Sequence, residues 1–314
     1  MTNVKPIAMR DAFLWQLHAA MKADETIFLL SADFGSPVVD HIRSDFPGRF
    51  VNVGIAEQNL INIAAGLSLE GYKVFCYAIA PFITMRCFEQ IRVNLALLSE
   101  VRDLNVNLVG VGAGYSYVVS GPTHQCYEDL SIMRSLPNLR ILSPSDHLTA
   151  ADAIAYALEH SGPKYLRFDA QVLPVLGDNE KTLERGYRAL SEGNDLCLVA
   201  TGYATHIALS VAAKLSADLS LNCQILDISR LDSDVDLSTA ITSDRVISIE
   251  EAFEGRGGLD AFVRCCIPSN CKHLGVGVTP GYEFEIGTRN EIHEKVGIGL
   301  NSVYDRIKDW LEKL

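Results

Sequence analysis

Short apolar runs alternate with helical patterns along the first half of the chain. Runs rich in β-branched residues predict strands at 27–31, 73–78, 105–111, 139–142 and 164–168. Between them, apolar residues at helical spacing predict helices at 57–69, 86–99 and 147–160, after an amphipathic helix near the start. Strands that are apolar throughout and separated by helices are typical of a parallel sheet that is covered on both faces.

This alternation lapses between residues 170 and 194 and then resumes. Strands are predicted at 196–201, 223–228 and 245–250, and helices at 204–215, 258–266 and 302–314. The chain has 314 residues, whereas a single core stops growing at roughly 250–300 residues. We therefore predict two parallel-sheet α/β domains, at 1–175 and 190–314, joined by a linker at 176–189.

Composition excludes several classes of protein. The chain carries 27 Lys and Arg against 39 Asp and Glu, a net charge of −12, and has no basic run, so nucleic acid is an unsuitable partner. It has no run of about 20 apolar residues, so no membrane span is expected. Its eight cysteines include no C-x-x-C pair and there is no secretion signal, which predicts free thiols in a cytoplasmic protein and no zinc site.

Three polar segments are candidates for a site, and the one that ends the first strand lies where open α/β sheets bind ligands. Glu57 follows Val53-Gly54-Ile55-Ala56 and begins a predicted helix, His124 lies in the turn Gly121-Pro122-Thr123-His124-Gln125, and Asp33 ends the first strand. Each has an ordinary structural explanation. A first-turn glutamate complements the helix dipole by about 0.3–1 kcal/mol, for example, and most single histidines are structural or solvated.

Other motifs are weaker. The glycines at 110, 112 and 114 follow a strand but lack the third glycine of the dinucleotide-binding fingerprint, so they favour a structural turn over an NAD site. The sequence contains neither a P-loop nor the G-x-S-x-G motif of serine hydrolases.

Taken together, the three polar segments resemble one family, and further motifs support this. The chain is similar to the C-terminal half of a transketolase, in which a pyrimidine-binding domain of the thiamine-diphosphate fold precedes a transketolase C-terminal domain. The resemblance runs nearly end to end. It also rests on Met9-Arg10-Asp11-Ala12-Phe13, on Phe82 and Arg86, on Glu89-Gln90-Ile91-Arg92 and on Glu250-Glu251.

The resemblance also implies a partner. Transketolases carry a G-D-G motif for the metal and diphosphate in an N-terminal domain, and this sequence has no G-D-G; Met1 stands where the pyrimidine-binding domain should begin. We therefore expect one subunit of a split enzyme that is active only with an N-terminal subunit. That subunit would bind Mg²⁺ or Ca²⁺ and the diphosphate, in an α₂β₂ assembly in which this chain also contacts its own copy.

The resemblance implies four residues that contact thiamine diphosphate. Glu57 would hydrogen-bond the ring nitrogen N1′ of the aminopyrimidine and so promote the ylid that attacks a ketose carbonyl. Burial against the ring would raise the proton affinity of this carboxylate. Phe82 would stack on the aminopyrimidine, while Asp33 and Arg86 would lie close to the cofactor.

It also implies residues that bind the substrate. His124 would contact a hydroxyl or carbonyl of the donor sugar next to the reacting carbon, and would be catalytic together with Glu57. Arg10, Ser36 and Arg167 correspond to positions that hold a sugar phosphate. For Arg167 a structural ion pair is an equal alternative.

Two departures from the family concern the substrate. Ser120 replaces an aspartate that reads an acceptor hydroxyl, and Gly112 replaces a histidine that faces phosphate, while Tyr115-Ser116-Tyr117 replaces a glycine-rich segment. The predicted function is therefore transfer of a two-carbon ketol unit, or a related carboligase reaction, on an unusual sugar or keto acid.

Three alternatives remain open from the sequence. One is the β subunit of a 2-oxoacid dehydrogenase, although its second motif resembles Gly-Pro-His-His-Ser whereas this chain has Thr123-His124-Gln125. Another is a deoxyxylulose-phosphate synthase-like ligase. The third, from a different class, is a non-catalytic assembly subunit, which the joint presence of Glu57, Phe82 and His124 disfavours.

Overall fold

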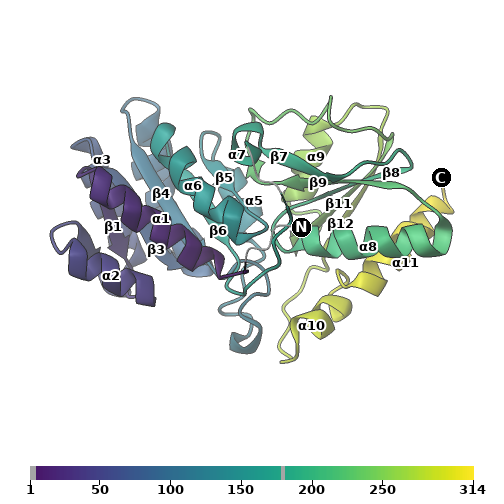
Figure 1. Ribbon diagram of the computed structural model, residues 1–314, viewed down its shortest axis with the longest axis horizontal. Helices are drawn as coiled ribbons and strands as arrows, with labels where there is room; N and C mark the ends of the chain where they lie inside the picture. The colour runs from purple at the N-terminus through teal and green to yellow at the C-terminus, as the bar shows by residue number, and fades with distance from the viewer. Residues whose placement is uncertain (1–4, 178–180) are drawn as a thin grey trace.

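Two sheets organise residues 5–177 and 181–314, which are the residues that the computed structural model describes. Each sheet and its helices form one of the two lobes that lie side by side in Figure 1. Met1 and residues 178–180 of the predicted linker lie outside the described residues.

The first sheet has seven strands in the order β10-β5-β6-β4-β3-β1-β2. All neighbours are parallel except β10, which pairs antiparallel with β5. The strands are β1 (Ile27–Ser31), β2 (Phe50–Asn52), β3 (Lys73–Ile79), β4 (Asn105–Val111), β5 (Arg140–Leu142), β6 (Lys164–Phe168) and β10 (Arg230–Leu231).

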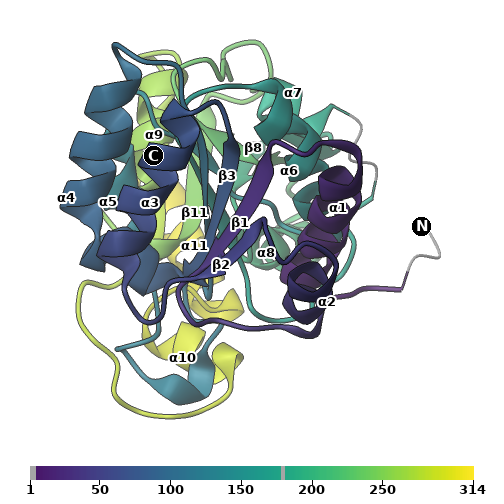
Figure 2. The ribbon, with the colours of Figure 1, turned by 90° about the vertical axis from the view of Figure 1, so that its left-hand side faces the viewer.

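Helices cover both faces of this sheet, which is why its strands are apolar throughout. Figure 2 shows α1, α2 and α6 on one side of β1 and β3, and α3, α4 and α5 on the other. The helices are α1 (Met9–Ala23), α2 (Pro37–Asp45), α3 (Glu57–Leu69), α4 (Phe88–Ile91), α5 (Asp129–Arg134) and α6 (His147–Glu159). In α1, Met9, Phe13, Leu17 and Met21 recur every fourth residue and are all buried, so one stripe of the helix packs on the sheet.

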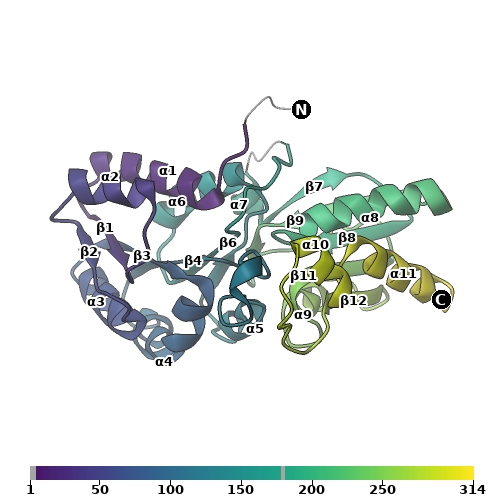
Figure 3. The same ribbon diagram turned by 90° about the horizontal axis from the view of Figure 1, so that it is seen from below.

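The second sheet has five strands in the order β12-β11-β8-β9-β7, with only β7 antiparallel to its neighbour. Figure 3 shows α8, α10 and α11 on one side of it and α9 on the other. The strands are β7 (Tyr187–Ser191), β8 (Leu196–Ala200), β9 (Cys223–Ile228), β11 (Arg245–Phe253) and β12 (Lys272–Val278); the helices are α8 (Ala204–Leu219), α9 (Leu259–Cys266), α10 (Arg289–Lys295) and α11 (Leu300–Leu311).

This architecture confirms the predicted fold class of two α/β domains, with an antiparallel strand added at one edge of each sheet. Two details differ from the sequence prediction. The helix expected at 86–99 is divided into η1 (Phe82–Arg86), α4 and η2 (Arg92–Leu97), because the flanking segments wind as π-helical turns. The segment expected as a linker contains α7 (Thr182–Arg185) and the start of β7.

A buried ion network joins the two lobes. Glu251, at the carboxyl end of β11, accepts hydrogen bonds from Arg289 at 3.0 and 2.5 Å, and pairs with His293 at 2.5 Å. Arg289 also pairs with Asp169, just after β6, at 2.7 Å. Burial alone would raise the pKa of Glu251, but the charges of Arg289 and His293 outweigh it and lower this pKa to about 2. The carboxylate is therefore held ionised between the lobes.

Among the described residues no helix, α1 and α8 included, is long and apolar enough to cross a bilayer.

Candidate active site

Glu57 begins α3, after the short turn 53–56 that follows the carboxyl end of β2 in the first sheet. Its side chain is only 2% exposed. The Arg86 guanidinium covers it and donates from Nη1 to both carboxylate oxygens, at 2.8 and 2.7 Å. The Arg86 side chain therefore covers the buried carboxylate and is itself 42% exposed.

Arg86 and Phe82 are brought together by the π-helical turn η1. Single π-turns within helices often occur at functional sites, because they shift side chains relative to a regular helix. Thr84 Oγ1 donates to the Ala80 carbonyl at 2.7 Å, and Cys87 Sγ lies 2.9 Å from the Ile83 carbonyl. These two contacts satisfy carbonyl groups in the irregular turn and hold its shape.

Phe82 lies between a cation and a histidine. The Arg86 guanidinium carbon is 4.4 Å from the ring centroid of Phe82, a cation–π distance. The His124 ring meets the same phenylalanine edge-on, with centroids 5.3 Å apart. Glu57, Arg86, Phe82 and His124, from three separate segments of the sequence, thus form one continuous set of contacts.

His124 lies on the loop 112–126, which follows β4 and folds back on itself. Gly114 and Cys126 exchange backbone hydrogen bonds of 2.7 and 2.9 Å at the base of this loop. His124 Nδ1 is 2.9 Å from Thr123 Oγ1, which fixes the orientation of the ring and leaves Nε2 for another partner. Ser120 is exposed on the same loop.

Asp33, after β1, is held by a residue that the sequence analysis did not single out. It adopts φ of +54°, which is uncommon for a residue other than glycine. Asn52 donates to Asp33 Oδ1 at 3.0 Å, and its own Oδ1 accepts from the backbone N–H groups of Asp33 and Gly54, at 3.1 and 2.9 Å. Asn52 therefore ties Asp33 to the turn that leads into Glu57. In the sequence, the only signal for this role of Asn52 is that it is a polar residue at the end of a strand.

Arg10 and Ser36 lie near the same edge of the sheet. Arg10, in the first turn of α1, pairs with Asp11 at 2.8 Å and lies near the phenols of Tyr77 and Tyr117. The Ser36 hydroxyl accepts from the Val39 N–H at 3.2 Å as the N-cap of α2, and Ser36 is 8% exposed. Arg10 remains available to a ligand from one side, whereas the Ser36 hydroxyl already serves a helix.

Arg167 is not brought to this group. It is buried and its Nε donates to Asp129 Oδ2 at 2.7 Å, while Nη2 donates to the Glu251 carbonyl at 3.2 Å. Tyr165 donates to the same Asp129 oxygen at 2.8 Å. Arg167 therefore forms a structural ion pair, which was the alternative to a phosphate contact, and its buried guanidinium has no open side toward a phosphate.

The thiol beneath the site is chemically inert. Burial, and then the negative charge of Glu57, raise the pKa of Cys87 to about 12. Because the thiolate is the nucleophilic form, this cysteine does not provide a nucleophile at neutral pH.

The residues present suit an aminopyrimidine ring. A cavity of about 410 Å³ is bordered by Glu57, Arg86, residues 55–56 and 58–59, and Asn62. A ring that carries a nitrogen acceptor and an apolar face needs a carboxylate and an aromatic side chain nearby. Glu57 supplies the carboxylate at the cavity, and Phe82, which contacts the cavity residue Arg86, supplies the aromatic side chain. Within the described residues, no group of three or more His, Cys, Asp or Glu side chains is arranged to hold a metal ion.

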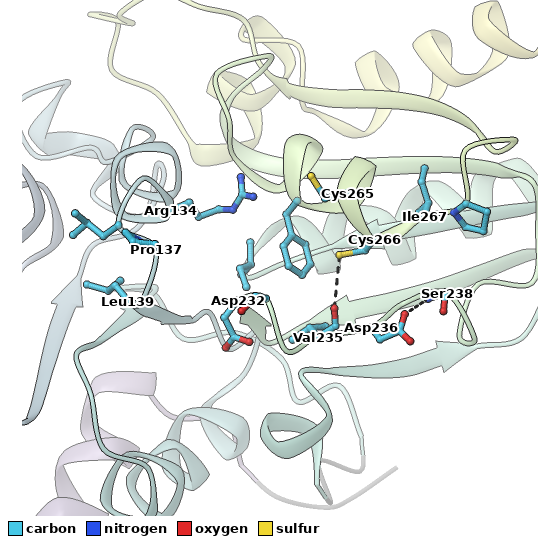
Figure 4. A pocket seen from close by; sticks show the side chains of 15 residues that line it. Arg134, Pro137, Leu139, Asp232, Val235, Asp236, Ser238, Cys265, Cys266 and Ile267 are labelled. Carbon is cyan, nitrogen blue, oxygen red and sulfur yellow. Dashed lines mark hydrogen bonds between the residues drawn. The ribbon is translucent and has the colours of Figure 1, made fainter. Parts of the chain in front are cut away.

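A cavity of about 740 Å³ lies elsewhere, between the lobes. Figure 4 shows its lining from both lobes, including Arg134, Asp232, Cys265 and Cys266. None of the predicted site residues borders it. It is therefore separate from the group around Glu57.

Comparison with known proteins places this geometry in a family. Residues 5–175 match the family model described as transketolase, pyrimidine binding domain. The chain is 29% identical over 304 residues to the 6-deoxy-6-sulfo-D-fructose transketolase subunit SqwH of a Clostridium species, covering 94% of this chain and 92% of that protein. It is 31% identical over 270 residues to an apulose-4-phosphate transketolase subunit of Actinobacillus succinogenes, covering 83% and 84%.

A solved structure agrees over the whole length. It is described as a split gene transketolase, an inactive β₄ tetramer, and superposes with a TM-score of 0.81 at 29% identity, covering 97% of this chain and 98% of that one. The resemblance predicted from the sequence motifs is thus confirmed. The chain belongs to the transketolase family and carries its pyrimidine-binding domain at residues 5–175.

Proposed function

We propose that this chain is the pyrimidine-domain subunit of a split transketolase that uses thiamine diphosphate to transfer a two-carbon ketol unit. The observation that carries the proposal is the contact set of Glu57, Arg86, Phe82 and His124. It combines a buried carboxylate that borders a cavity with an aromatic ring and a histidine that contact each other next to Arg86.

Each of these side chains has a distinct task. Thiamine diphosphate, when bound, supplies the electron sink that lets a bond next to a carbonyl break and form. Glu57 would hold a proton at the ring nitrogen N1′, and Phe82 would pack against the ring. Arg86 would give up at least part of its bidentate contact with Glu57 to admit the ring. His124, oriented by Thr123, would hydrogen-bond an oxygen of the donor sugar with its free Nε2.

Asp33 and Arg10 would complete the site, from the end of β1 and from the first turn of α1. Asp33, braced by Asn52, would approach the cofactor, and Arg10 would approach the distal part of the substrate. Ser120 would face the acceptor from the loop that carries His124. We leave Ser36 and Arg167 out of the proposed substrate contacts, since the first caps a helix and the second is enclosed in an ion pair.

The partner is an N-terminal transketolase subunit that holds the diphosphate with Mg²⁺ or Ca²⁺. The names of both relatives describe them as subunits, and the related structure is a β₄ tetramer described as inactive. These support an α₂β₂ complex in which this chain also associates with its own copy. The free cysteines, among them Cys76, Cys87 and Cys197, suit a cytoplasmic location.

The substrate is a sugar or keto acid other than an ordinary pentose phosphate. The names of the two relatives refer to a sulfonated fructose and to apulose 4-phosphate, which supports substrate variation in this group. These names do not favour a 2-oxoacid dehydrogenase, a deoxyxylulose-phosphate synthase-like ligase or a non-catalytic subunit. Ser120 and Gly112, at positions where the family carries an aspartate and a histidine, agree with altered recognition.

The test is reconstitution with a candidate N-terminal subunit, followed by steady-state assays of ketol transfer from a panel of ketoses to aldehydes. We expect turnover by the mixture and none by either subunit alone. Turnover by this chain alone, or a clear preference for xylulose 5-phosphate with ribose 5-phosphate, would contradict the proposal.

A further inference from the structure

Tyr117 lies over Gly112, at the end of β4, and fills the space that a side chain at residue 112 would need. A Cβ atom added to Gly112 would fall on the Tyr117 ring. Gly112 also adopts φ of +103°, a conformation that favours glycine. The half-buried ring and the bare backbone beneath it therefore form one fixed surface.

This surface belongs to the candidate active site. Tyr117 and His124 lie on the same loop, whose base is closed by the hydrogen bonds between Gly114 and Cys126. Arg10 approaches from α1. Burial raises the pKa of Tyr117, and the nearby positive charge of Arg10 opposes that rise, which places the two side chains close together.

The charges around Tyr117 are already balanced. Arg10 pairs with Asp11 at 2.8 Å, and Arg289 pairs with Asp169 at 2.7 Å. Asp169 lies near enough to Tyr117 for its negative charge to raise the phenol pKa as well. A phosphate dianion placed here would meet paired arginines and a nearby carboxylate, an unfavourable setting for a second negative charge.

We propose that Tyr117 determines specificity at the distal end of the substrate site, and that the enzyme selects ketoses whose last carbon carries no phosphate. This inference deepens the proposed function and rests on it. The ring limits the length of the bound sugar, and Arg10 hydrogen-bonds its terminal hydroxyl. A site built to bind phosphate would favour the phosphorylated sugar by roughly 10⁴-fold, because its polar groups would otherwise be left unpaired.

The test compares three donors in the reconstituted complex, with glycolaldehyde as the acceptor. Xylulose and xylulose 5-phosphate differ only in the phosphate, and erythrulose is one carbon shorter than either. In the wild-type complex we expect the ratio of kcat/KM for xylulose 5-phosphate to kcat/KM for xylulose to be at or below one. Tyr117→Ala should raise this ratio at least about tenfold, through a lower KM for the phosphorylated donor. It should leave kcat/KM for erythrulose unchanged.

Two further variants make the result specific. Tyr117→Phe keeps the ring and should keep the wild-type ratio. Tyr72 is a matched half-buried tyrosine next to the amino end of β3, and Tyr72→Ala should leave kcat/KM unchanged for all three donors.

A higher wild-type kcat/KM for xylulose 5-phosphate than for xylulose, or an equal change of kcat/KM for all three donors in Tyr117→Ala, would overturn the inference while leaving the proposed function in place. Absence of turnover with every donor, erythrulose included, would contradict the proposed function itself and the inference with it.

Discussion

Two arginine–carboxylate pairs near the same edge of the first sheet differ in what surrounds them. Arg167 and Asp129 are 2% and 0% exposed, and Tyr165 and a backbone carbonyl complete their hydrogen bonds. Glu57 is equally buried at 2%, but its partner Arg86 is 42% exposed and borders a cavity. The first pair is closed and structural, whereas the second can open. Burial of a carboxylate therefore does not distinguish a site from a core; the exposure of its partner does.

The strongest effect should follow from Glu57→Gln, which keeps the size of the side chain but cannot share a proton with the cofactor. Loss of a positioned acid–base group costs about 10²–10⁴-fold, so kcat/KM of the reconstituted complex should fall by that factor. Steady-state assays measure it. Glu89→Gln, which breaks an exposed pair with Arg92, is the matched control and should change kcat/KM less than about twofold. A twofold loss in Glu57→Gln would mean that Glu57 only complements its helix.

Arg167→Met should mainly affect stability. Removing one partner of a buried ion pair leaves the other charge uncompensated, which costs about 3–5 kcal/mol. Urea unfolding of the isolated chain would show this as a lower midpoint with a similar slope. Arg92→Met, from an exposed pair, should cost less than about 1 kcal/mol. If Arg167→Met were as stable as the wild type but lost activity only with phosphorylated substrates, Arg167 would be a substrate-binding residue after all.

Acid should weaken the network between the lobes. The pKa of Glu251 is about 2 in the folded chain, against an ordinary value of 4.5. Because the folded-state pKa is depressed, the stabilisation is present above pH 4.5 and is lost as the pH falls toward 2. Unfolding midpoints measured across this range should fall more steeply for the wild type than for Glu251→Gln. Parallel curves would show that the pair does not contribute through its charge.

The weakest effect should be that of Arg86→Met on stability. Water from the adjacent cavity can reach Glu57 once the guanidinium is gone, so the free energy of unfolding should fall by about 1–2 kcal/mol, less than for Arg167→Met. Thermal unfolding of both variants side by side gives the comparison. Equal losses would show that the Glu57 pair is as closed as the Asp129 pair.

The fold could largely be predicted from the sequence, because strands that are buried on both faces leave a clear apolar signal. The strands at 105–111 and 164–168 agree with β4 and β6 residue for residue. Very short strands such as β10, with two residues, leave no periodic signal and depend on tertiary pairing. The π-helical turns around Phe82 and Arg92 escaped prediction for a related reason, since their apolar spacing still resembles an α-helix.

The site could be predicted only in part. Motif resemblance pointed to Glu57, Phe82, Arg86 and His124, which the structure brings into mutual contact. It could not reveal that Arg167 is enclosed by Asp129, because an ion pair between residues 38 positions apart depends on the sheet topology. Nor could it show that the Tyr117 ring fills the space over Gly112, because the sequence does not show how a loop folds back.

Whether Glu57 is the open carboxylate that receives the cofactor can be tested by calorimetric titration with thiamine diphosphate and Mg²⁺. The titration would be done with this chain alone, with a candidate N-terminal subunit alone, and with their complex. We predict tight binding only by the complex, abolished or strongly weakened by Glu57→Gln and unaffected by Glu89→Gln. Tight binding to this chain alone, or equal binding by the wild-type and Glu57→Gln complexes, would contradict this assignment.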